Sequence, residues 1–185
     1  MRGLCAITTL SVALLGAGVA AAQSVGTAPL TFRGTAAPAC RMSTPTSEAG
    51  QNAELDSAAP GAAEISIARL AGDDGSVIGA NMALNIPVLC NQAHTLTVES
   101  RRGGLSLSQS PVEATAFRTS VPYRVRVSWA GANDDFSSDG SNAILSIGDA
   151  GQGLLNVVID IPAGGVPLVA GSYSDELVLV LSVAG

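Results

Sequence analysis

The sequence predicts an all-β protein, and three observations support this. Short runs of β-branched and apolar residues recur between turn signals along most of the chain. Residues that favour helices are scarce, since the chain has no Lys and few Glu or Gln, while it has 21 Gly and many Ser, Thr and Val. After the first 22 residues, no stretch repeats its apolar residues with the period of a long amphipathic helix. This combination is typical of a fold built from short strands.

The first 22 residues have the three parts of a secretory signal peptide. Arg2 supplies a positive charge, residues 6–20 are apolar and uncharged, and Ala20-Ala21-Ala22 offers small residues for cleavage. We therefore expect residues 1–22 to be removed on export, leaving Gln23 as the first residue. The alternative, a membrane anchor, is disfavoured because the apolar stretch is shorter than the ~20 residues that span a bilayer.

The remainder has the length of one domain with a single core. Its longest apolar run, residues 177–181, has the length of a strand, so we expect no membrane span in the mature chain. The formal net charge is −6, and all nine basic residues are Arg. An acidic chain without a basic patch is a poor candidate for binding nucleic acid, and the absence of Lys excludes Schiff-base chemistry.

Glycine-containing turns separate the expected strands, for example Gly72-Asp73-Asp74-Gly75 and Ala163-Gly164-Gly165. The polar, small residues 43–60 are expected to form a long loop. The predicted strands are Leu30–Thr35, Glu64–Ala68, Met82–Cys90, Thr95–Ser100, Leu105–Ser108, Tyr123–Trp129, Ala143–Ile147, Leu154–Ile161 and Glu176–Val183.

Two of these strands carry the most information. In residues 123–129 the apolar residues alternate with Arg124, Arg126 and Ser128, which predicts one buried face and one face in water. The last strand, residues 176–183, is apolar on both faces. It is expected to lie deep in the core or beside a partner that covers it, because a bare apolar edge invites aggregation.

Two cysteines, Cys40 and Cys90, remain after removal of Cys5 with the signal peptide. In an oxidising compartment they most simply form one disulfide. Free thiols or a metal site are the alternatives, but no neighbouring His or Cys has the spacing of a metal ligand. We expect no cofactor.

The sequence gives little indication of a catalytic site. His94 is the only histidine and no G-x-S-x-G motif accompanies it, so we expect it to lie at the surface or in a turn. The acids are dispersed and are expected to be solvated: Glu99, Glu113, Asp160, Asp175 and Glu176. We therefore predict that the protein is not an enzyme.

One segment imitates a calcium-binding loop. Asp135, Ser137 and Asp139 place oxygen ligands at alternate positions, and Gly140 follows them. Ser146 stands where the bidentate Glu of such a loop is expected, and no helix flanks the segment. A polar turn is the favoured interpretation and calcium binding the alternative.

Several segments, in this order, resemble the spore coat protein U domain family, which includes the archaic (Csu-type) chaperone–usher pilins. The most specific is the ending Ala170-Gly171-x-Tyr173-x-Asp175-x-Leu177. The others are Ala39-Cys40-Arg41-Met42, Ile86-Pro87-Val88-Leu89-Cys90 followed by His94-Thr95-Leu96-Thr97-Val98, and Val121-Pro122-Tyr123-Arg124-Val125.

The resemblance implies an immunoglobulin-like β-sandwich over residues 40–185 that lacks its final strand. A donor strand from another subunit would complete it, which is β-augmentation used for assembly. The last strand would then border an unfilled groove through Leu177, Leu179, Leu181 and Val183.

Residues 23–39 form an N-terminal extension that could act as the donor strand. One face of the extension would carry Ala28, Leu30, Phe32, Gly34 and Ala36, and the other Thr31, Arg33 and Thr35. This alternation suits a strand that lays one face into a groove. A frayed N-terminus or an ordinary first strand is the alternative.

The expected function is that of a structural subunit of a surface fimbria, with roles in adhesion and biofilm formation. Its partners would be other pilin subunits, a periplasmic chaperone and an outer-membrane usher, and it would pass through the periplasm to the cell surface. The alternatives are a secreted coat or binding protein of the same fold that does not polymerise, and a periplasmic enzyme with a polar pocket around His94.

Overall fold

A computed structural model describes residues 29–109 and 116–183, and within these ranges the chain forms fourteen strands and no helix. The prediction of an all-β fold is confirmed. Residues 1–35 and 36–185 are separate units. The expected signal peptide, Ala28 and Glu113 lie outside the described residues.

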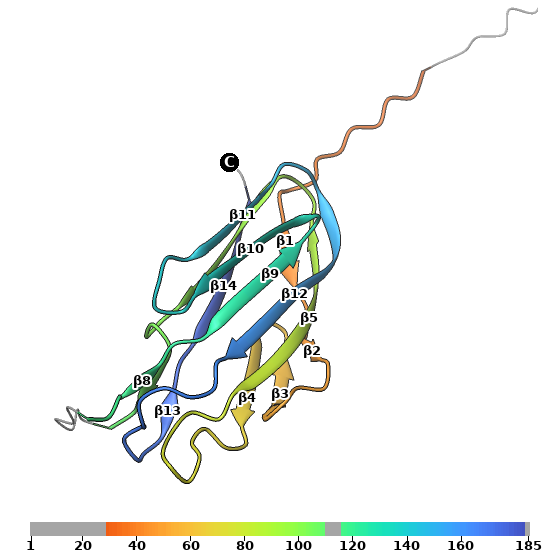
Figure 1. The fold of residues 1–185 in the computed structure, drawn as a ribbon. Helices are drawn as coiled ribbons and strands as arrows, with labels where there is room; N and C mark the ends of the chain where they lie inside the picture. Colours follow the sequence, from red (N-terminus) through yellow and green to blue (C-terminus); the bar gives the residue numbers. More distant parts are fainter. Residues whose placement is uncertain (1–28, 110–115, 184–185) are drawn as a thin grey trace, which may run out of the picture. The chain divides into compact units, whose positions relative to one another are not determined.

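The larger sheet is antiparallel and has the order β1-β5-β12-β9-β10 (Figure 1). Its strands are β1 (Cys40–Met42), β5 (Ala80–Cys90), β12 (Gly151–Ile161), β9 (Arg124–Trp129) and β10 (Ala132–Ser137). The short β2 (Thr46–Ser47) also pairs with β5, further along the edge where β1 lies. The two eleven-residue strands β5 and β12 pair along their whole length and form the centre of this layer.

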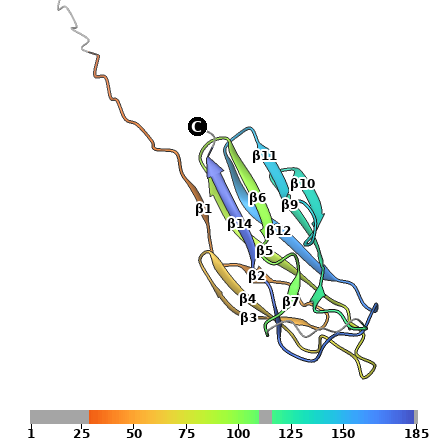
Figure 2. The same cartoon turned by 90° about the vertical axis from the view of Figure 1, so that its left-hand side faces the viewer.

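The second layer has the order β11-β6-β14 (Figure 2). It consists of β11 (Ala143–Ile147), β6 (His94–Ser100) and β14 (Leu177–Val183). Within the described residues β14 pairs with β6 alone, so its other edge is open. The last strand is therefore half-buried at the margin of a sheet and does not lie deep in the core.

Two smaller sheets complete the fold. One joins β13 (Tyr173–Ser174), β7 (Leu105–Leu107) and β8 (Ser120–Val121). The other is a hairpin of β3 (Ala53–Ala59) and β4 (Ala62–Ile67). The expectation of a long loop over residues 43–60 is wrong, because β2 and β3 lie there. The hairpin forms because its alternate apolar residues find the core to pack against.

The core lies between the inner faces of the two layers. Strand β9 shows the pattern most clearly, since Val125, Val127 and Trp129 are buried while Arg124 and Arg126 are exposed. The predicted faces of this strand are confirmed. Leu96 and Val98 of β6, with Leu145 of β11, supply the opposing side chains.

The predicted strands within β4 to β7, β9, β11, β12 and β14 are confirmed, with shifts of a few residues at their ends. Several other segments differ from prediction, among them the two-residue strands β8 (Ser120–Val121) and β13 (Tyr173–Ser174), which were not predicted. Residues 30–35 form no strand, because among the described residues no neighbouring strand pairs with them. Strand β10 was not predicted, since its sequence Ala-Asn-Asp-Asp-Phe-Ser has low strand propensity. Complete pairing with β9 stabilises it.

Candidate functional site: an apolar groove beside the last strand

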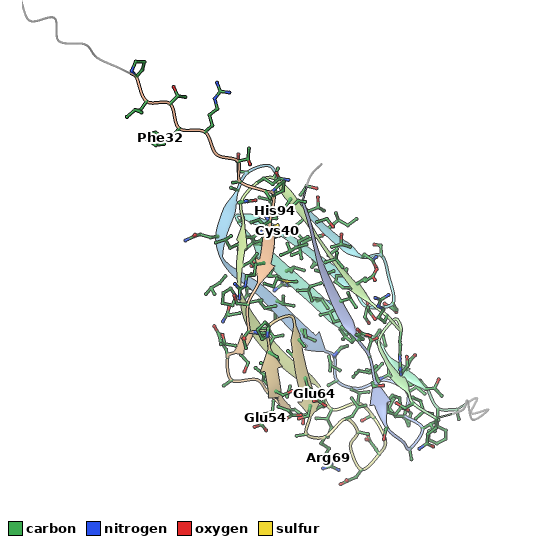
Figure 3. All side chains as sticks on the ribbon, turned by 180° about the vertical axis from the view of Figure 1, so that it is seen from behind. Phe32, Cys40, Glu54, Glu64, Arg69 and His94 are labelled. Carbon is green, nitrogen blue, oxygen red and sulfur yellow. A yellow bond between two sulfur atoms is a disulfide. The ribbon has the colours of Figure 1, made fainter. Side chains whose placement is uncertain are left out.

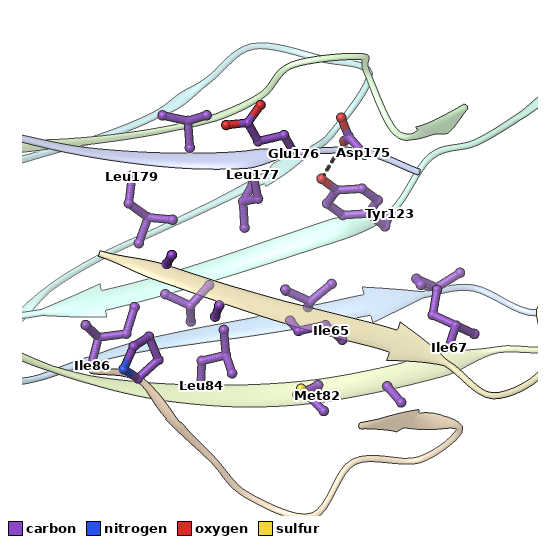
Figure 4. A pocket seen from close by; sticks show the side chains of 18 of the residues that line it. Ile65, Ile67, Met82, Leu84, Ile86, Tyr123, Asp175, Glu176, Leu177 and Leu179 are labelled. Carbon is purple, nitrogen blue, oxygen red and sulfur yellow. Dashed lines mark hydrogen bonds between the residues drawn. The ribbon is translucent and has the colours of Figure 1, made fainter. Parts of the chain in front are cut away.

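A groove of about 430 Å³ lies beside β14 (Figure 4). Residues of several strands line it, including Val157, Ile159 and Ile161 of β12. Met82, Leu84 and Ile86 come from β5, Ile65 and Ile67 from the hairpin, and Leu177 and Leu179 from β14. Alternate residues of a strand point to the same side of its sheet, and in these strands the residues that point to the groove are apolar. Such a lining suits the burial of apolar side chains.

The open edge of β14 borders this groove. Residues 177–183 use one side of their backbone to pair with β6, in register from Leu177 opposite Ser100 to Val183 opposite His94. The other side has no strand partner among residues 29–109 and 116–183. Unpaired backbone groups next to an apolar trough are the two features that a further β-strand needs for binding.

A hydrogen-bonded network closes one end of the groove. The Tyr123 hydroxyl donates to Asp175 Oδ2 at 2.7 Å, and the Ser100 hydroxyl donates to the same oxygen. The backbone N–H of Arg102 donates to Asp175 Oδ1 at 3.0 Å. Asp175 thus ties the start of β14 to the end of β6. The expectation that Asp175 is merely solvated is wrong.

Burial raises the pKa of the Tyr123 hydroxyl, and the hydrogen bond to Asp175 and the charge of that carboxylate raise it further. The Tyr123 hydroxyl therefore keeps its proton and donates a hydrogen bond to the carboxylate. The network gives the groove a polar, acidic end, while most of the remaining lining is apolar.

The four candidate positions on β14 do not share one environment. Leu177 and Leu179 line the groove. Leu181 is half-buried and packs on the core, and Val183 is exposed. The groove therefore lies beside the first half of β14.

The candidate donor residues Leu30 and Phe32 are 84% and 91% exposed. Gly34 and Ala36 are exposed as well, and Ala28 lies outside the described residues. Apolar side chains as large as Leu and Phe are expensive to leave in water, since burying each stabilises by roughly 1.5–3 kcal/mol.

The predicted disulfide between Cys40 and Cys90 is present, with an S–S distance of 2.04 Å. It joins β1 to the end of β5, where the two residues face each other in register. The bond holds the first strand of residues 36–183 against the edge of the larger sheet.

His94 is 1% exposed, so the expectation of a surface or turn residue is wrong. Trp129 Nε1 donates to His94 Nε2 at 2.7 Å, and His94 Nδ1 donates to the Gln92 carbonyl at 2.9 Å. The sulfurs of Cys40 and Cys90 and a ring nitrogen of His94 lie within 4.8 Å of one another. Figure 3 shows His94 and Cys40 at the same end of the two layers. The expectation that no neighbouring His has the spacing of a metal ligand is therefore also wrong, but the sulfurs are bonded to each other and both ring nitrogens are engaged.

The segment that imitates a calcium loop is split between a strand and a turn. Asp135 lies in β10 opposite Arg126, and Ser137 donates to Asp139 Oδ1 at 2.5 Å in the following turn. These three residues are exposed. The arrangement is that of a polar turn, which agrees with the favoured interpretation.

The hairpin residues of the groove were missed by the sequence analysis. A signal was available, because Leu55, Ile65 and Ile67 sit at alternate positions on either side of Pro60-Gly61, a typical turn. Gly61 has a φ of 79°, which favours glycine at this turn. The scarcity of large apolar residues between positions 43 and 60 concealed the pattern.

No family model matches the chain, and no curated protein and no solved structure shows significant similarity to it. Within the described ranges no helix is long and apolar enough to cross a bilayer.

Proposed function

We propose that this protein is a structural subunit of a surface fimbria that assembles by donor-strand complementation in the chaperone–usher pathway. The observation that carries the proposal is the open edge of β14 beside an apolar groove. A strand laid there would pair with β14 and bury its apolar face on Leu84, Leu177 and Leu179.

The strand order supports an immunoglobulin-like sandwich that lacks one strand. Such domains have the orders A-B-E-D and C-F-G in their two sheets. The order β1-β5-β12-β9 corresponds to A-B-E-D, and β6-β14 corresponds to C-F. The place of strand G, next to β14, has no occupant among the described residues.

The donor in this proposal is the N-terminal extension of a second copy or of a related subunit. Leu30 and Phe32 share one face of an extended segment, and both are exposed. Before assembly, a periplasmic chaperone would cover the groove, and an outer-membrane usher would pass the subunit to the cell surface. The fibre would then serve adhesion and biofilm formation.

The test compares two variants of the mature chain, Phe32→Asp and Thr31→Asp. Asp at position 32 places a carboxylate in the apolar groove of the neighbour, where an unpaired charge is costly to bury. Asp at position 31 lies on the opposite face of the donor and leaves the apolar face intact. We expect wild-type protein and Thr31→Asp to form linear oligomers in size-exclusion chromatography and electron microscopy, and Phe32→Asp to remain unassembled.

The Phe32→Asp subunit keeps its own groove and can therefore still accept a donor. A synthetic peptide of residues 27–37 should bind this variant and raise its thermal midpoint. If wild-type protein stays monomeric and Phe32→Asp ignores the peptide, the proposal is rejected in favour of a coat or binding protein that does not polymerise.

A further inference from the structure

We infer that the β3–β4 hairpin is a movable strap, which covers part of the groove in the free subunit and swings away when a donor strand enters. The inference rests on the proposed function and concerns the regulation of the same groove. Four features of the hairpin support it, namely its pairing, its attachment, its inner face and its outer face, and the chemistry of the donor adds a fifth argument.

The hairpin pairs with neither layer of the protein. β3 and β4 form a two-stranded sheet of their own, so among the described residues no ladder of backbone hydrogen bonds joins them to β5 or β14. At the base of the hairpin Gln51 and Asn81 exchange backbone hydrogen bonds, but beyond this base side chains hold the hairpin, so it can move away without breaking a sheet. Its opening therefore costs less than the removal of a paired strand.

Asn52 attaches the hairpin at its base. Its Nδ2 donates to the carbonyls of Arg69 and Gly79 at 2.7 and 3.3 Å, and its Oδ1 accepts from the Arg69 N–H at 3.0 Å. The φ of Asn52 is 56°, in the left-handed region that Asn tolerates better than most residues. Asn52 thus links the start of β3 to the residues that follow β4, and this polar anchor can act as a hinge.

The inner face of the hairpin takes up space beside β14. Ile65 and Ile67 project into the groove between the side chains of β5 and those of β14 (Figure 4). Both residues are only half-buried. They shield Met82 and Leu84 from water without filling the groove as a paired strand would.

The outer face is acidic. Glu54, Asp56 and Glu64 are exposed, and no basic residue lies between Ala53 and Ile67 (Figure 3). Charges on this face keep the hairpin in water and disfavour its pairing with other strands, since its edges are open. The hairpin is thus apolar toward the groove and charged toward solvent, as a removable cover must be.

The donor segment cannot lie beneath this cover. With Leu30 and Phe32 directed at the core, Arg33 would point outward, against the apolar inner face of the hairpin. A guanidinium beside Ile65 and Ile67 would have no carboxylate partner on the inner face of the hairpin, since the two acids that line the groove, Asp175 and Glu176, belong to the segment before β14. The hairpin must therefore move aside, after which Arg33 reaches water.

Hydrogen exchange of the Phe32→Asp subunit, with and without excess peptide 27–37, tests the movement directly. We expect the amides of residues 53–67 to exchange faster when the peptide is bound, while those of β14 become protected. Slower exchange of residues 53–67 would show that the hairpin closes over the donor as a clamp, and would overturn the inference.

A second test compares Ile65→Ala/Ile67→Ala with Glu64→Gln/Ser66→Ala, both in the Phe32→Asp background. The first pair weakens the inner face and the second changes the outer face of the same strand. We expect the first pair to bind more of the dye ANS and to raise the association rate of the peptide about tenfold. The control pair should change neither, and Ile65→Ala alone replaces the double variant if that variant does not fold.

Unchanged dye binding and association in the inner-face variant would overturn the strap. If the peptide binds to no variant while dye binding still rises in the inner-face variant, the donor-strand function fails and the hairpin remains a cover of the groove. The two failures are thus distinguishable.

Discussion

Trp129 and His94 join the two layers of the protein through a buried hydrogen bond of 2.7 Å between the indole Nε1 and the imidazole Nε2. Indole can only donate and the Gln92 carbonyl can only accept, so the imidazole is neutral, with its proton on Nδ1. His94 lies next to the Cys40–Cys90 disulfide. The pair connects β9 of the larger sheet with β6 of the smaller one at the end of the core where the disulfide lies.

The first prediction concerns this pair. Trp129→Phe keeps an aromatic ring in the core but leaves His94 Nε2 without its donor. We expect a loss of about 1–3 kcal/mol in the free energy of unfolding from the unsatisfied nitrogen, and about 3–5 kcal/mol for Trp129→Ala. Chemical denaturation measures both. Arg126→Ala, on the exposed face of the same strand, should stay within about 0.5 kcal/mol of wild type, and equal losses at the two positions would contradict the assigned faces.

The second prediction concerns the disulfide. Protein collected from the periplasm or the cell surface should have a mass lower by two hydrogens than its reduced form, and should begin at Gln23. The double variant Cys40→Ser/Cys90→Ser should lose about 2–5 kcal/mol of stability. The finding of two thiols that react with iodoacetamide without prior reduction would contradict the bond.

The third prediction concerns Tyr123, whose pKa is higher in the folded than in the unfolded chain. The resulting stabilisation is fully present below the ordinary tyrosine pKa of about 10 and is lost as the pH rises toward the folded value. We expect the unfolding free energy of wild type to fall more steeply above pH ~10 than that of Tyr123→Phe. Tyr173 is common to both proteins, so its own raised pKa cancels in the comparison. Parallel curves would show that Tyr123 does not resist ionisation.

The fourth prediction uses two adjacent residues of β14. Leu179 lines the groove, whereas Val180 is 44% exposed on the other face. Leu179→Asp should abolish binding of peptide 27–37 to the Phe32→Asp subunit, because it charges the groove. Val180→Asp should leave the affinity unchanged in isothermal titration calorimetry. A loss of binding at position 180 would place the peptide on the outer face of the sheet.

The sequence by itself determined the all-β class, most strands and the pairing of the cysteines. Residues 123–129 show why, since alternation with a period of two is a local property that a short window reveals. The disulfide needed only a count of cysteines and an oxidising destination, with no knowledge of which strands would carry them.

Only the tertiary structure decided the roles of residues whose partners are remote in the sequence. His94 is a buried acceptor because Trp129, 35 residues away, brings a donor to it. Asp175 is bound because Tyr123 and Ser100 meet it across 52 and 75 residues. No sequence pattern near His94 or Asp175 predicts these contacts.

The groove depended on tertiary structure most of all. The apolar last strand was visible in the sequence, but whether it lay in the core or at an edge depended on which strands paired with it. β6 pairs with one side of β14, the other side has no strand partner among the described residues, and β4 supplies part of the lining because β3, expected to be a loop, pairs with it. Pairing and packing are long-range interactions whose energies depend on what each face meets, so local propensity decides neither the open edge nor its cover.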